Sequence, residues 1–180
     1  MQYIKILTII LLICIIVGSM FVFTGCDKDK EGADFSMEAI KKFQDNENLF
    51  EQVKENILKN IPDNITFVTL YVDKSNHVIA KNGASVYNDL SFDESFKESL
   101  LRLSAELKPM SMDIDYDIYD AEGMENKTIK FHLSTGSIRG KGIVYITNND
   151  GEDLKEKLRG LSVLCHIKGN WYYYEELGGV

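Results

Sequence analysis

Cysteine and histidine are scarce in this chain, which has three of each among 180 residues. Cys14 and Cys26 lie in or next to an apolar N-terminal stretch, which leaves Cys165 alone in the rest of the chain. The disulfide framework of many small secreted domains is therefore excluded, and we predict that the chain forms no internal disulfide. His77 and His132 have no companions at the spacing of a zinc site, so we predict neither a metal site nor a bound cofactor.

Basic residues are few as well, with 20 Lys and Arg against 28 Asp and Glu and a formal charge of −8. The first 25 residues hold one lysine and no acidic residue, so the charge of the remainder is −9. Nucleic acids are held mainly by basic side chains that neutralise phosphates, so we do not expect a nucleic-acid partner. The same negative charge repels anionic lipid, and any attachment to a membrane must come from the N-terminus.

The motifs of several enzyme classes are missing. The chain contains no nucleophile elbow, no zincin helix and no dinucleotide-binding fingerprint. The glycine-rich segment 136–142 fails as a phosphate loop because its glycines are too close and Gly142 replaces the Ser or Thr that would hold magnesium. Glycine in a strand more often marks a bulge or a close backbone approach, which we predict here. We predict no catalytic residue.

A long apolar run is present at the N-terminus. Lys5 supplies a positive start, residues 6–22 are almost entirely apolar, and the small residues Thr24 and Gly25 precede Cys26. Charged residues follow at once in segment 27–31. Residues 23–26 (Phe-Thr-Gly-Cys) resemble the lipobox of bacterial lipoproteins, although Phe23 stands where leucine is usual. The alternative is an uncleaved membrane anchor, since about 20 apolar residues can cross a bilayer core as a helix.

The lipobox resemblance implies that the Cys26 thiol is joined to diacylglycerol and that the peptide is cut just before this residue. It therefore implies a signal peptide over residues 1–25 and a lipid-anchored linker over 26–35. We expect a single domain over 36–180, because the remaining length suits one domain. The resemblance implies that this domain is held on the outer side of the bacterial cell membrane.

The rest of the chain alternates helical and strand patterns and predicts an α+β fold. We expect helices packed on one face of a curved antiparallel sheet of five to seven strands. A helical stripe ends at Pro62, with a break near residues 45–48 and a capping pair at Asn48 and Glu51. A second capping pair, Ser91 and Glu94, starts another helix. The predicted helices are 36–62, 91–108 and 152–158, and the predicted strands are 65–72, 77–80, 112–118, 129–133, 142–147, 161–168 and 171–176.

Asp113, Asp115 and Asp117 alternate with apolar residues on one predicted strand. They do not form an EF-hand loop, because its glycine and its bidentate glutamate are both missing. Strand register predicts that Asp115 lies by Lys130 and Asp113 by His132, and a tight turn at 135–136 would extend the row to Arg139 and Lys141. These pairs predict a solvated, charge-paired sheet face; the alternative is an ion or ligand surface that includes Asp113 and Asp115.

Two features near the C-terminus are candidates for a site. Cys165 and His166 are adjacent on a strand and point to opposite faces, so they cannot act as nucleophile and base, and we place Cys165 in the core with Tyr172 and Tyr174. Trp171 and Tyr173 fall on the opposite face from these tyrosines. Either one aromatic pair is exposed as a binding surface that includes Trp171 and Tyr173, or one face fills the core and the other is covered.

These patterns favour a membrane-anchored, non-catalytic binding or envelope module with an envelope protein as its partner. One alternative is a protective lipoprotein that binds a toxin or hydrolase through an exposed aromatic or acidic patch. Another is a small enzyme with a pocket in the curved sheet where Asp, His or Tyr side chains converge. The charge-paired sheet face predicts that no such convergence occurs.

Overall fold

The computed structural model of the protein describes residues 32–62, 64–73, 75–82, 85–86, 92–121, 124–135, 138–147 and 161–176. The predicted signal peptide and the predicted helix 152–158 lie outside these residues. Within the described part of the chain, no helix is long and apolar enough to cross a membrane.

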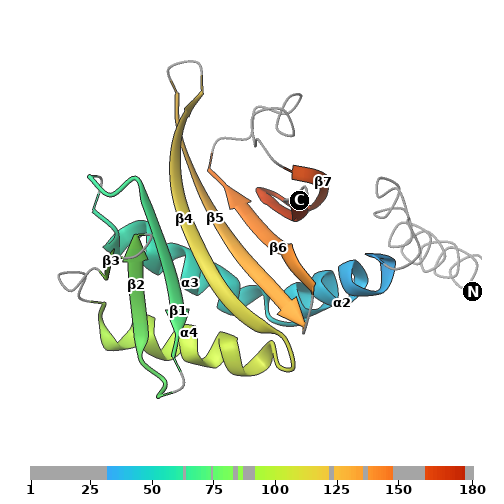
Figure 1. Cartoon of the computed structure of the whole chain (residues 1–180), viewed down its shortest axis with the longest axis horizontal. Helices are drawn as coiled ribbons and strands as arrows, with labels where there is room; N and C mark the ends of the chain where they lie inside the picture. The colour runs from blue at the N-terminus through green and yellow to red at the C-terminus, as the bar shows by residue number, and fades with distance from the viewer. Residues whose placement is uncertain are drawn as a thin grey trace, which may run out of the picture.

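The strands form one antiparallel sheet, which confirms the predicted α+β class (Figure 1). Its order is β3-β2-β1-β4-β5-β6-β8-β7, and its eight strands exceed the predicted number by one because the two-residue strand β3 adds to the edge. The strands are β1 (Phe67–Val72), β2 (Val78–Asn82), β3 (Ser85–Val86), β4 (Ser111–Ala121), β5 (Met124–Thr135), β6 (Ile138–Ile146), β7 (Leu161–Lys168) and β8 (Trp171–Glu176).

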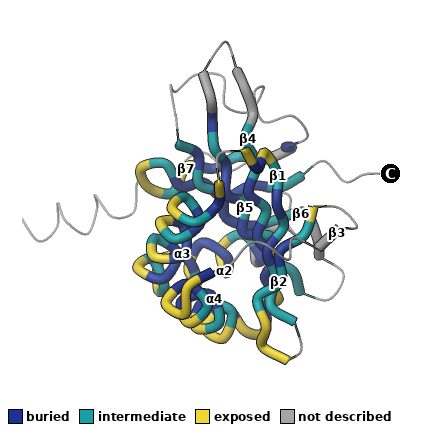
Figure 2. The backbone as a smooth tube through the Cα atoms, turned by 90° about the vertical axis from the view of Figure 1, so that its left-hand side faces the viewer, coloured by how far each residue is buried: buried dark blue, intermediate teal, exposed yellow. Residues whose placement is uncertain are grey.

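Helices α2 (Gly32–Asp45), α3 (Glu47–Asn60) and α4 (Glu94–Glu106) lie on one side of this sheet (Figure 2). Phe43 packs on Trp171 with ring centroids 5.1 Å apart, and Phe50 packs on Phe131 at 4.9 Å. We call this side of the sheet the core face and the opposite side the distal face. Helix α2 begins inside the predicted linker, and Phe35 is already part of the core.

The helices begin at other residues than predicted. The break between α2 and α3 falls at Asn46, whose side chain makes no capping hydrogen bond, so Asn48 lies inside α3 and does not cap it. At α4 the Asp93 carboxylate is the cap and accepts a hydrogen bond from the Phe96 amide at 2.7 Å, while the predicted cap Ser91 lies outside the described residues. The predicted apolar stripe of α4 is buried throughout: Phe92, Phe96, Leu100, Leu103 and Leu107.

The predicted register of β4 and β5 is confirmed, since Asp113 lies opposite His132 and Asp115 opposite Lys130. The predicted continuation to Lys141 is wrong. An irregularity between Leu133 and Thr135 shifts the register of β5 against β6, and a shift of one residue moves a side chain to the other face. Lys141 therefore forms an ion pair with Glu175 at 3.1 Å, and the side chain of Arg139 lies outside the described residues.

Gly142 confirms the predicted close backbone approach. A Cβ atom at this position would lie 1.9 Å from the carbonyl oxygen of Phe131 on β5, which no side chain could tolerate.

Cys165 and His166 point to opposite faces as predicted, and Cys165 is in the core. Its neighbours differ from the prediction, because a register shift between His166 and Lys168 places Cys165 opposite Tyr173. Cys165 is disulfide-bonded, so the prediction of no internal disulfide is wrong. The only other cysteines of the sequence, Cys14 and Cys26, lie outside the described residues.

Candidate functional site

The four aromatic residues of β8 are all buried, so they form no exposed pair. Trp171 and Tyr173 lie on the core face and are 3% and 0% exposed. Tyr172 and Tyr174 lie on the distal face, where they belong to a second apolar cluster with Val144, Ile146 and Leu161. The predicted surface at Trp171 and Tyr173 is therefore core, with Trp171 alone also lining a pocket described below.

A chain of hydrogen bonds crosses the distal face. The Thr69 hydroxyl donates to Oδ1 of Asp115 at 2.6 Å, and Oδ2 of Asp115 lies 2.8 Å from Nε2 of His132. The second ring nitrogen of His132, Nδ1, lies 2.6 Å from the hydroxyl of Tyr174. A neutral imidazole protonated at Nε2 satisfies both contacts, with Tyr174 as donor to Nδ1.

The side-chain pairs on this face do not follow the register partners. His132 bonds Asp115, the diagonal neighbour of its register partner Asp113, and Lys130 reaches across β6 to pair with Glu176 at 3.3 Å although Asp115 is its register partner. Diagonal neighbours are within reach of long and aromatic side chains. Asp113 itself is exposed. The predicted charge-paired face therefore exists, with different partners.

Two aspartates of this face have opposite electrostatic environments. Burial opposes the ionisation of Asp115, but hydrogen bonds from His132 and Thr69 outweigh it and lower the pKa of this carboxyl. Burial raises the pKa of Asp117, and the attraction of Lys130 does not offset it. Burial, together with the negative charges of Glu176 and Asp115, raises the pKa of Tyr174 well above its usual value. Tyr174 is therefore a protonated donor, not a phenolate.

This arrangement holds strands together rather than presenting reactive atoms. Tyr174 is 0% exposed, and both ring nitrogens of His132 are already bonded to protein groups. Asp115, His132 and Tyr174 do converge, but on the sheet face and outside the pocket that the structure describes, so they are not the pocket expected of the enzyme alternative.

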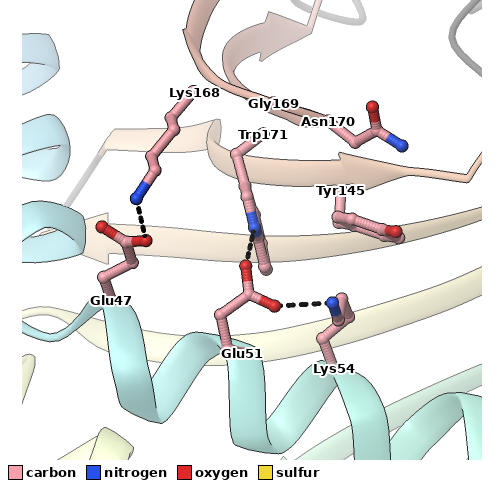
Figure 3. A pocket seen from close by; sticks show the side chains of 8 residues that line it. All are labelled: Glu47, Glu51, Lys54, Tyr145, Lys168, Gly169, Asn170 and Trp171. Carbon is pink, nitrogen blue, oxygen red and sulfur yellow. Dashed lines mark hydrogen bonds and ion pairs between the residues drawn. The ribbon is translucent and has the colours of Figure 1, made fainter.

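That pocket lies between the start of α3, strand β6 and the turn that joins β7 to β8 (Figure 3). Its volume is about 310 Å³. In Figure 3, Glu51 lies between Trp171 above it and Lys54 beside it, and Lys168 reaches down from the turn to Glu47. The lining residues are Glu47, Glu51, Lys54, Tyr145, Lys168, Gly169, Asn170 and Trp171.

The charged groups of the pocket are paired with one another. The Trp171 indole N–H donates to Oε1 of Glu51 at 2.6 Å, and Nζ of Lys54 donates to Oε2 at 2.5 Å. Lys54 also contacts Glu55 at 2.9 Å and lies 4.6 Å from the centre of the Tyr145 ring. Burial opposes the charge on Glu51, but the bonds from Lys54 and Trp171 outweigh it and lower the pKa of Glu51.

Only one side of this pocket could have been predicted from the sequence. Glu47, Glu51 and Lys54 are spaced to share one face of a helix, which a helical projection of α3 would have shown. Their partners come from the end of the chain, since Lys168 is 121 residues from Glu47 and Trp171 is 120 residues from Glu51. That juxtaposition depends on the tertiary fold.

Within the described residues, no group of three or more His, Cys, Asp or Glu side chains is arranged to hold a metal ion. Comparison with known protein families, with curated proteins and with solved structures finds no match to this chain.

Proposed function

We propose that the protein is a bacterial lipoprotein, anchored by diacylglycerol on Cys26, whose α+β domain is a non-catalytic binding module outside the cytoplasm. In this proposal the sulfur of Cys26 carries lipid and Cys14 is removed with the signal peptide, so the processed chain keeps no internal disulfide partner for Cys165. The observation that carries the anchor is the position of Cys26, directly after Thr24 and Gly25 at the end of a long apolar run. Two acyl chains are enough to hold a protein stably on a bilayer, so the acidic domain needs no membrane affinity of its own.

The non-catalytic role is supported by the burial and the hydrogen bonds of the polar groups on the distal face. A general acid or base must reach its substrate, and a nucleophile must be exposed to it. Tyr174 is fully buried and His132 is bonded at both nitrogens, so neither has a free position for a substrate. The pocket beside α3, in contrast, is open to solvent and lined by charged and aromatic groups that a ligand can reach.

The anchor is tested by metabolic labelling of the full chain in bacterial cells with labelled palmitate. We expect label on the wild type and on Cys165→Ala, which removes a different cysteine, and no label on Cys26→Ala. The Cys26→Ala protein should also keep the size of the precursor, because processing follows lipidation. Unchanged labelling of Cys26→Ala, or no label on the wild type, would defeat the proposal.

A further inference from the structure

We propose that the pocket between α3 and the β7–β8 turn binds an organic cation, a primary ammonium or a guanidinium group. This inference deepens the proposed binding role, because it names the ligand chemistry of the module. Small-molecule pockets span about 300–1,000 Å³, and this one, at about 310 Å³, is sized for a single small group.

The lining has the composition that recognises such cations. Glu47 and Glu51 supply two carboxylates from successive turns of α3, and Tyr145 supplies a partly exposed aromatic ring. The Trp171 ring lies 5.1 Å from it, centroid to centroid, and is largely covered, with 3% of the residue exposed. Carboxylates bind ammonium and guanidinium groups through charge-assisted hydrogen bonds, and aromatic faces attract the same groups through their quadrupoles. Carboxylates and rings therefore favour the same class of ligand.

Two lysines of the chain already use these recognition groups. Lys54 binds Glu51 and lies over the Tyr145 ring, with a side chain only 8% exposed (Figure 3). Lys168 binds Glu47 at 2.6 Å, with a side chain 65% exposed. Lys54 is a fixed part of the pocket wall, because it also contacts Glu55. Lys168 reaches Glu47 from the solvent-exposed side of the pocket.

Lys168 is therefore an internal occupant that an external cation can replace. Exposed ion pairs contribute little to stability, so breaking the pair with Glu47 costs little. Lys168 is followed by Gly169, which has a positive φ of +54° and open space where a Cβ would be. An incoming cation would take the place of the Lys168 ammonium on Glu47 and could contact Glu51, whose side chain is 38% exposed.

An anion is disfavoured by the same contacts. The ammonium groups of Lys54 and Lys168 both face carboxylates, and the indole N–H of Trp171 is used by Glu51. An anionic ligand would have to displace those carboxylates and approach a chain with a formal charge of −8. The long-range field instead raises the local concentration of cations.

The chain has a single tryptophan, and it lines this pocket, so intrinsic fluorescence reports on the site directly. The full chain, purified in detergent, is titrated with Nα-acetylarginine amide into the millimolar range, and Nα-acetylcitrulline amide serves as the uncharged isostere. We expect a saturable change in Trp171 fluorescence with Nα-acetylarginine amide and none with Nα-acetylcitrulline amide. A basic peptide tests the source of the cation: tighter binding than Nα-acetylarginine amide assigns the pocket to a basic side chain of a protein partner, and equal binding to a free small cation.

Three variants make the assignment specific. Glu47→Gln should weaken binding of Nα-acetylarginine amide at least about tenfold, because a charged acceptor is lost. Lys168→Gln should tighten it several-fold, because the internal competitor is removed, and Glu98→Gln, exposed on α4, should leave it unchanged. The proposal is overturned if Lys168→Gln shows no saturable response, or if Glu47→Gln binds like the wild type. Palmitate labelling is independent of this readout, so a failed pocket and a failed anchor are distinguishable.

Discussion

The hydroxyl of Tyr174 on β8 lies 2.6 Å from Nδ1 of His132 on β5, although β6 separates these strands. The β6 residue that faces both of them in the register is Gly142. Because glycine has no side chain, the two rings can meet above it. The hydrogen-bond chain of the distal face therefore depends on a glycine that the sequence had marked as a point of close approach.

Gly142→Ala tests that close approach. The new Cβ would meet the backbone oxygen of Phe131 at 1.9 Å, and a backbone atom cannot move aside as a flexible side chain would. We expect the free energy of unfolding, measured by urea denaturation, to fall by about 3 kcal/mol or more. Gly169→Ala is the control: nothing lies within 4 Å of its added Cβ, and only its positive φ should cost about 1 kcal/mol. Equal losses for the two variants would contradict the account of Gly142.

Tyr174→Phe tests the hydrogen bond to His132. The variant keeps the ring in its apolar cluster and leaves Nδ1 of His132 without its donor. Loss of one partner of a part-buried hydrogen bond should lower the free energy of unfolding by about 1–2 kcal/mol. The control is Tyr145→Phe, which removes a hydroxyl on the core face that makes no hydrogen bond to another described residue, and it should change stability by less than about 0.5 kcal/mol. The hydrogen bond would have no structural value if both variants unfolded like the wild type.

Asp115 and Asp117 should respond to pH with opposite signs. The lowered pKa of Asp115 means that its stabilisation is present above the unfolded value, about 3.9, and is lost as pH falls through the folded pKa. Asp115→Asn should therefore destabilise the protein by about 1–3 kcal/mol at neutral pH, with a smaller effect in acid. The raised pKa of Asp117 disfavours its charge in the fold, so Asp117→Asn should be stabilising at neutral pH. Denaturation curves at several pH values test both signs, and a loss of stability in Asp117→Asn at neutral pH would refute the second.

The two glutamate–lysine pairs of the pocket should contribute unequally to the free energy of unfolding, because one pair is more buried than the other. Glu51→Ala would leave Lys54, with its side chain 8% exposed, short of one carboxylate and Trp171 without its acceptor. We expect a loss of about 1–3 kcal/mol in the free energy of unfolding. Glu47→Ala, one turn earlier on α3, breaks only the exposed pair with Lys168 and should cost less than about 1 kcal/mol. Similar losses of stability in Glu51→Ala and Glu47→Ala would show that burial does not determine how much each pair contributes.

The local sequence pattern was enough to predict most helices and strands and the register of β4 with β5. Alternation of apolar and acidic residues fixed which face of β4 is buried, and the pairing of Asp115 with Lys130 followed from it. The registers at Lys141 and Cys165 were wrong because each depends on an irregularity that shifts one strand by a residue. The pocket was missed because Glu47 and Lys168 meet only in the folded chain.

The most direct test of the anchor is mass spectrometry of the N-terminal peptide of the full protein isolated from bacterial membranes. A thioether and a disulfide exclude each other at one sulfur, so this peptide has to show one state of Cys26. We predict a peptide that begins at Cys26 and carries the mass of a diacylglyceryl group. A peptide that continues upstream of Cys26 without lipid, or one joined through Cys26 to the peptide that contains Cys165, would contradict the account.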